Sequence, residues 1–356
     1  MRRLLVRALR FLGSALLVAL VTAALAEVTL AAIRHVPALS RIGIVTPLAR
    51  ELYFLDRSMI QLLPECARWD PDLGYTLRPG RCSFENTEYR TTLLVNRLGV
   101  RDSEKALAEP ELVVLGDSFA LGWGVEGDET FAARLAKMTG LRVLNTGVAS
   151  YGTVRELKIL SKVDRSRLRT IVWQFCNNDY RENEAYAKDG NRLATLPEAE
   201  YESWVRIHAK GRRYVPGRYL ASALSTRVRA LSGSPGVEPA SPDPADPAVR
   251  RNQVTFFLNA LETSPVDPSG YRIVLFELNG RNQHADWFLP MLRAEIARGA
   301  HPEWIRRLVL VDVAAQLLPS DFYVLDDHLT PGGQRKLAEI LLPFVRPADR
   351  QRGPAS

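Results

Sequence analysis

Histidine and cysteine are scarce in this sequence, and positive charge is not concentrated in the body of the chain. The 356 residues include five histidines and three cysteines, and the cysteine spacing matches no zinc-binding pattern. The net charge is +7, but no block of lysine and arginine with interleaved aromatic residues occurs. These absences argue against a metal centre and against nucleic-acid binding. We therefore expect no metal, no cofactor and no nucleic-acid partner.

The basic excess lies at the N-terminus, ahead of a long apolar run. Four arginines fall in the first ten residues, residues 11–26 carry no charge, and Glu27 interrupts before a second apolar stretch. Residues 11–33 are long enough to span a hydrocarbon core of about 30 Å. Residues 24–26, Ala-Leu-Ala, also suit signal-peptide cleavage. We predict that 1–34 is an uncleaved membrane anchor, with cleavage near Ala26 as the alternative.

Both alternatives have the same topology. Positive charge stays on the cytoplasmic side, so everything after residue 34 is expected to be exported. In an oxidising compartment two cysteines can pair. Cys66 and Cys82 share a polar stretch with proline and glycine, so we predict a disulfide between them, with two unpaired thiols as the alternative. Cys176 ends an apolar run and is expected to be a buried thiol.

Short apolar runs and helical patterns alternate through most of the chain. A membrane-proximal region at 35–110, with a strand at 89–95, precedes a main domain at 111–345. Strands are expected at 112–115, 141–144, 170–175, 271–278 and 308–313, and helices at 129–138, 153–163, 284–298 and 331–345. Continuous apolar strands separated by helices predict an α/β fold with a parallel sheet covered on both faces.

The alternation fails between about 181 and 265, which we interpret as an insertion into the main domain. Within it, 232–248 is rich in proline, serine and aspartate and predicts a flexible loop, and a helix is expected at about 250–261. The insertion would either cover a ligand site or decorate the surface. The tail at 346–356 is expected to be disordered.

Four polar blocks lie at the ends of these expected elements. Ser118 comes after the first strand of the main domain, Gly147 after the second, Asn178 after the third, and Asp326-Asp327-His328 before the last helix. Each block alone also fits an ordinary turn or helix cap. The carboxyl ends of parallel strands meet at one edge, so the four together predict one site. A serine hydroxyl, a histidine base with a carboxylate, and N–H donors are the groups that acyl transfer needs.

On these blocks the sequence resembles the SGNH/GDSL hydrolases over roughly 111–345. The resemblance implies a three-layer α/β/α, flavodoxin-like sheet, with Ser118 as nucleophile and His328 as base. It also implies oxyanion donors from Ser118, Gly147 and Asn178. The segments 96–102 and 121–125 are similar to bacterial, exported, N-terminally anchored members of this family.

Two departures from the family pattern affect the site. Cys176 replaces the usual glycine of the third block, so that turn can differ. The commonest spacing puts the aspartate three residues before the histidine, where this chain has Leu325. We therefore predict Asp326 as the acid that orients His328, with Asp327 as the less favoured choice.

The predicted function is a serine esterase that hydrolyses acyl esters, with short-chain O-acetyl esters favoured. One alternative is an O-acyltransferase acting on a cell-surface polysaccharide, and another is a non-catalytic glycan-binding protein on the same fold. Expected partners are an acyl ester substrate, from a cell-envelope glycan or lipid, and the membrane through the N-terminal helix. The catalytic domain is expected in the periplasm or outside the cell.

Overall fold

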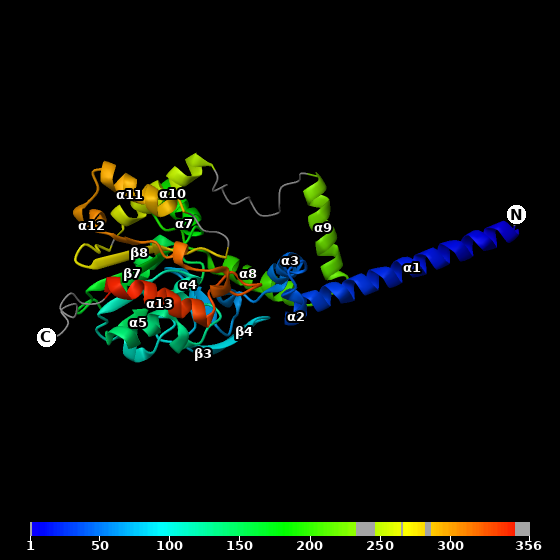
Figure 1. Cartoon of the computed structure of the whole chain (residues 1–356), viewed down its shortest axis with the longest axis horizontal. Helices are drawn as coiled ribbons and strands as arrows, with labels where there is room; N and C mark the ends of the chain where they lie inside the picture. The colour runs from blue at the N-terminus through cyan, green and yellow to red at the C-terminus, as the bar shows by residue number, and fades with distance from the viewer. Residues whose placement is uncertain (1, 233–245, 265, 282–285, 346–356) are drawn as a thin grey trace. The chain divides into compact units, whose positions relative to one another are not determined.

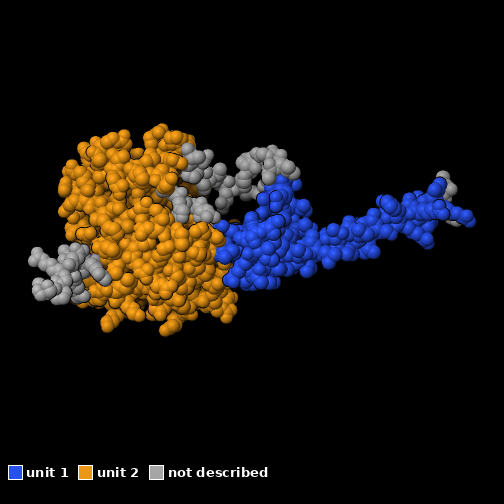
Figure 2. Space-filling model, viewed as in Figure 1, with its two compact units in different colours: residues 1–57, 209–241, 324–326 blue, residues 58–208, 242–323, 327–356 orange. Residues whose placement is uncertain are grey.

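In the computed structural model the chain forms two compact units (Figures 1 and 2). The structure describes residues 2–232, 246–264, 266–281 and 286–345. Unit 1 comprises 1–57, 209–241 and 324–326, and unit 2 comprises 58–208, 242–323 and 327–356. The predicted flexible loop at 232–248 lies mostly outside the described residues, and the predicted tail at 346–356 lies wholly outside them.

A five-stranded parallel sheet forms the centre of unit 2. Its strands are β5 (Leu112–Leu115), β6 (Val143–Asn145), β7 (Thr170–Phe175), β8 (Arg272–Glu277) and β9 (Val309–Val311). The order β6-β5-β7-β8-β9 is the flavodoxin-like order, in which the second strand lies outside the first. The register places Val113 beside both Leu144 and Ile171. The predicted fold class is confirmed.

Helices cover both faces of this sheet because successive strand residues point to opposite sides. Val113, Leu115 and Trp173 pack in one core with the first helical layer. Leu112, Val114 and Val274 pack in a second core with the other layer (Figure 1). The first layer contains α6 (Thr153–Ser161), α10 (Pro247–Glu262) and α11 (Phe288–Arg298), and the second contains α5 (Phe131–Thr139) and α13 (Pro331–Val345).

Two small antiparallel sheets precede the main sheet. They pair β1 (Ala67–Asp70) with β2 (Gly74–Leu77) and β3 (Gly80–Asn86) with β4 (Tyr89–Val95). A disulfide joins Cys66 to Cys82 across a Cα–Cα distance of 5.3 Å, as predicted, and Cys176 is a buried free thiol. Unit 2 also contains α4 (Ser118–Leu121), α7 (Asp179–Lys188), α12 (Glu303–Arg306) and residues 198–208 of α8 (Glu198–Arg212). Short 3₁₀ turns lie at Ile60–Leu62, Glu104–Leu107, Gly127–Glu129, Ala314–Gln316 and Pro319–Asp321.

The predicted insertion at 181–265 contains most of α7 and all of α8, α9 (Arg218–Ser232) and α10. The helix expected at 250–261 is α10, and its Phe257 and Leu261 pack in the core beside the sheet. This part of the segment therefore belongs to the helical layer. The domain boundaries drawn from the sequence stay predictions.

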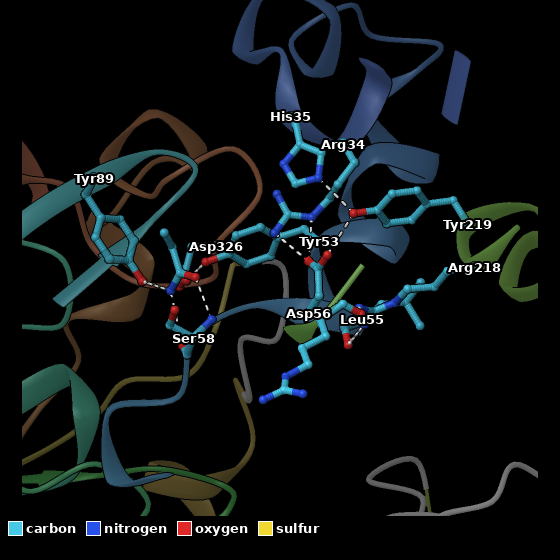
Figure 3. A network of polar contacts seen from close by, with 12 residues as sticks. Arg34, His35, Tyr53, Leu55, Asp56, Ser58, Tyr89, Arg218, Tyr219 and Asp326 are labelled. Atoms are coloured by element: carbon cyan, nitrogen blue, oxygen red, sulfur yellow. Dashed lines mark hydrogen bonds and ion pairs between the residues drawn. The ribbon is translucent and has the colours of Figure 1, made fainter. Parts of the chain in front are cut away.

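Unit 1 is helical and includes the apolar N-terminal segment. It contains α1 (Arg2–His35), α2 (Pro37–Ser40), α3 (Thr46–Asp56) and α9. Residues 3–35 of α1 are long and apolar enough to cross a membrane, a property that a signal sequence shares. Arg34 forms a buried ion pair with Asp56 at 2.6 Å, and Tyr219 Oη donates to Asp56 Oδ2 at 2.9 Å (Figure 3). These contacts join α1, α3 and α9.

A buried carboxyl ends the fourth strand of the sheet. Glu277 is the last residue of β8, and Asn279 Nδ2 donates to its Oε1 at 2.7 Å. Burial, with a smaller contribution from the charges of Asp312 and Asp286, raises the pKa of Glu277 to about 8, and the hydrogen bond from Asn279 acts against this rise. An acid whose folded pKa exceeds its unfolded pKa stabilises the fold below the unfolded value. That stability is lost as the pH rises from about 4.5 to about 8.

We expect Glu277→Gln to stabilise unit 2 against heat, with a gain that grows from pH 5 to pH 8.5. The glutamine keeps an acceptor for Asn279 and removes the ionisation that favours unfolding. The gain has a ceiling of about 5 kcal/mol, because each pKa unit corresponds to about 1.4 kcal/mol. Thermal unfolding of the full chain in detergent at several pH values measures it. The matched control is Glu303→Gln on the exposed start of α12, and an equal gain at every pH would contradict the prediction.

Candidate active site

Ser118 begins α4 directly beyond the carboxyl end of β5. The turn requires Gly116, whose φ is +148° and where an added Cβ would lie 2.5 Å from Gln174 Oε1. That same Oε1 accepts the N–H of Asp117 at 3.0 Å. Asp117 then caps the short helix by accepting the N–H of Phe119 at 3.0 Å. The backbone is thereby fixed on both sides of the serine.

His328 and Ser118 lie together at this edge of the sheet. His328 Nε2 is 2.7 Å from Ser118 Oγ, and the two residues are only 8% and 9% exposed. The loop that carries the histidine is closed by two backbone hydrogen bonds, from Tyr323 N–H to His328 O at 3.0 Å and from Thr330 N–H to Asp321 O at 2.8 Å. A neutral imidazole at hydrogen-bond distance can take the hydroxyl proton.

Two aromatic rings hold the imidazole, and sequence reasoning gave neither of them a role. Trp123 stacks on His328 with ring centroids 4.8 Å apart and planes 16° apart, and the Phe119 ring lies 4.7 Å away. Trp123 lies between Gly122 and Gly124, whose φ values are +77° and +79°. The glycine–tryptophan–glycine run in the sequence could have indicated the role of Trp123, because two glycines allow a tight turn around one large side chain.

The Asn178 side chain points at the serine turn. Its Nδ2 donates to Asp117 Oδ2 at 3.0 Å. A primary amide carries two N–H donors, so this bond leaves one for a ligand. Burial raises the pKa of Asp117, and the bonds from Phe119 N–H and Asn178 act against that rise. The hydrogen bond to Asp117 orients the amide toward the serine turn.

Gly147 follows β6, and its N–H donates to Asn145 Oδ1 at 3.0 Å. A bound oxyanion would therefore share this N–H with Asn145 or replace it as the acceptor. The glycine also has a packing role, because an added Cβ would lie 2.3 Å from Leu121 N in α4. The predicted oxyanion role of Gly147 stays a prediction.

The two candidate acids differ in their surroundings. Asp326 is fully buried, and its Oδ2 accepts a hydrogen bond from Tyr53 Oη of α3 (Figure 3). Asp327 is half-buried, and its backbone carbonyl accepts the N–H of Arg281 at 3.3 Å. Tyr53 and Asp326 are 273 residues apart, so no local pattern could have identified the tyrosine.

The third block is supported from the next strand. The N–H of Asn177 donates to Asn279 Oδ1 at 2.7 Å, and Asn279 in turn donates to Glu277. Cys176, which stands where the SGNH/GDSL motif has glycine, is buried, and burial raises the pKa of its thiol well above the usual value. The thiol is therefore protonated and unsuited to act as a nucleophile. Among the described residues, no group of three or more metal-ligating side chains could hold a metal ion.

No family model and no curated protein sequence matches the chain. Among solved structures it is similar to a protein assigned to the lipolytic G-D-S-L family from Desulfitobacterium hafniense DCB-2. That match has 11% identity and a TM-score of 0.34, over 66% of this chain and 98% of the other. It is also similar to the lipase Lip_vut3 from a goat rumen metagenome, with 12% identity and a TM-score of 0.34, over 67% and 98%.

Proposed function

We propose that the chain is a serine ester hydrolase whose nucleophile is Ser118. The observation that carries this proposal is the 2.7 Å contact between Ser118 Oγ and His328 Nε2, buried at the carboxyl edge of a parallel sheet. A serine hydroxyl is a weak nucleophile until an adjacent base takes its proton. A merely structural serine at this turn would need no histidine stacked in place beside it.

The reaction has two acyl-transfer steps. Ser118 Oγ attacks the ester carbonyl while His328 Nε2 takes the hydroxyl proton. The oxyanion accepts hydrogen bonds from the N–H groups of Ser118 and Gly147 and from the Asn178 amide. When the tetrahedral intermediate collapses, His328 returns the proton to the departing alcohol and Ser118 keeps the acyl group. Water then attacks the acyl-enzyme with His328 again as base, and Ser118 is released.

Asp326 is the acid that we propose for His328. It stands two residues before the histidine, and the hydrogen bond from Tyr53 fixes its carboxylate. Its full burial favours it over the half-buried Asp327, because a buried carboxylate keeps one orientation and supports an imidazolium more strongly. We propose short acyl esters of the cell envelope as substrates.

We propose that α1 is an uncleaved anchor that keeps the enzyme on the outer side of a membrane. The helix continues without a break through Ala26, and the Glu27 carboxylate that follows accepts the N–H groups of Tyr219 and Leu220 at the start of α9. Cleavage after Ala26 would place a new ammonium group on Glu27. That positive charge would lie beside the positive end of the α9 dipole.

We expect Ser118→Ala to lower kcat/KM by at least about 10³-fold, because the nucleophile is lost while ester binding remains. A panel of esters from acetyl to long-chain measures this and identifies the preferred acyl length. A fluorophosphonate probe should label the parent protein and not the variant. Ser161→Ala, at the exposed end of α6, is the matched control. Unchanged turnover or labelling in Ser118→Ala would remove this serine from the mechanism.

We expect Tyr53→Phe to lower kcat/KM by about tenfold, because a hydrogen bond to a charged group is lost. Without the hydroxyl, the Asp326 carboxylate is more basic and holds the imidazolium more tightly. The acidic limb of the pH profile should therefore move to higher pH by about 0.5–1 unit. A loss that is uniform across the pH range would mean that Tyr53 supports the fold only.

The matched control for Tyr53 is Tyr219→Phe. Tyr219 is another tyrosine of unit 1 whose hydroxyl donates to a carboxylate, in this case Asp56. Its removal should leave the acidic limb in place. A shift of the same size in both variants would show that the change reflects loosening of unit 1.

A further inference from the structure

The start of α9 is bonded to a single carboxylate on α1. Glu27 Oε2 accepts the N–H of Leu220 at 2.7 Å, and Oε1 accepts the N–H of Tyr219 at 3.3 Å and the hydroxyl of Tyr214 at 3.1 Å. The first N–H groups of a helix lack partners within it, and a carboxylate there also stabilises the helix dipole. The start of α9 is therefore fixed at the level of Glu27 along α1.

Glu27 stands where the uncharged apolar run at 11–26 ends. The uncharged run at 11–26 would extend about 24 Å as a helix, close to the thickness of a hydrocarbon core. Large apolar side chains of this run are exposed, whereas Arg34, further along α1, is buried among unit 1 contacts. If α1 crosses a membrane, Glu27 lies at its outer boundary, and so does the start of α9.

Tyr219 shows which way α9 is turned. Its hydroxyl is 2.8 Å from His35 Nε2 and donates to Asp56 (Figure 3). Because His35 lies eight residues beyond Glu27 on α1, the Tyr219 side chain points away from the apolar run at 11–26. Ala221, Leu224 and Val228 lie between about 140° and 200° around the helix from Tyr219, at about 100° per residue. Their face is therefore turned back toward the apolar run.

This second face of α9 is apolar and exposed. Leu224 is 56% exposed and Val228 is 61% exposed. Figure 1 shows α9 leaving α1 at a steep angle instead of running alongside it. A helix that crosses a membrane-spanning helix at the boundary lies along the membrane plane. An amphipathic helix in that position buries its apolar side among the upper acyl chains.

We propose that α9 is an interfacial membrane helix, with Ala221, Leu224 and Val228 inserted into the leaflet where α1 leaves the hydrocarbon. The proposal rests on α1 as an uncleaved anchor and is independent of ester hydrolysis. Arg227 is exposed at the edge of this apolar face, where its guanidinium can pair with lipid phosphates. The occupant is therefore the bilayer that α1 crosses, and α9 fixes the rotation and depth of unit 1 against it.

Depth-dependent fluorescence quenching tests this on the full chain in phosphatidylethanolamine–phosphatidylglycerol vesicles. Single cysteines replace Leu224 or Val228 and carry an environment-sensitive dye. Cys66 and Cys82 are bonded and Cys176 is buried, so the parent protein provides the labelling blank. We expect lipids with a nitroxide on an upper acyl carbon to quench both dyes at least about twofold more than a dye at Thr226. Thr226 is exposed on the Tyr219 side of α9 and is the matched control.

A dye at Leu17, in the middle of the apolar run, tests the anchor role of α1 separately from the interfacial role of α9. Strong quenching by a deep nitroxide at Leu17 supports the anchor. With that result, equal quenching at positions 224, 226 and 228 would overturn the interfacial role of α9. Absence of quenching at Leu17 would instead contradict the anchor itself. Water shielding at 224 and 228 without lipid quenching would indicate a protein partner and would also overturn the proposal.

Discussion

The buried amide of Gln174 joins β5, β7 and β8 at the edge of the sheet where the candidate site lies. Its Oε1 accepts the N–H of Asp117 beyond β5, and its Nε2 donates to the carbonyl of Leu278 beyond β8 at 3.3 Å. The residue is fully buried in β7, between those strands. Loss of the amide would leave two buried backbone groups without partners, at a cost of about 1–3 kcal/mol each. The same side chain makes glycine necessary at position 116.

A second set of amides extends this support to the oxyanion side. Asn279 links the N–H of Asn177 to the carboxyl of Glu277, and Asn178 links its own turn to Asp117. Such networks stabilise a site only when each member has its partner, because an unpaired polar group is costly at low dielectric. The raised pKa of Glu277 shows that this cost is only partly compensated. The hydrogen-bond donors at this edge of the sheet are thus kept oriented, and the free energy of unfolding is lower above neutral pH as a consequence.

The sequence predicted most of the sheet and the residues at its edge. The runs 112–115 and 170–175 became β5 and β7 with the same bounds, because strands buried on both faces leave an unbroken apolar signal. The rule that carboxyl ends converge then brought Ser118 and His328, 210 residues apart, to one place. The catalytic roles assigned to these residues stay predictions.

Other features depended on side-chain directions that no local pattern carries. Gln174 is indistinguishable from an ordinary strand residue in Thr-Ile-Val-Trp-Gln-Phe, and only its position between two strand ends gives it a function. Asn145 stands two residues before Gly147, in the second polar block. Its Oδ1 accepts the Gly147 N–H that a bound oxyanion would also need, and this contact depends on the rotamer of the asparagine side chain. Tyr53 precedes the main domain entirely, and its contact with Asp326 requires the fold of unit 1.

Unit 1 also explains why charged residues occur in a helix whose first part is apolar. A helix that served only to hold the chain in a membrane would gain nothing from Glu27 or Arg34. They lie seven residues apart, which places them on one face of α1, and both are buried with partners on other helices. Buried charges are tolerated when fully paired, and such pairs specify one arrangement over others. The end of α1 is therefore part of a folded unit, and a change in its depth or rotation would have to break these bonds.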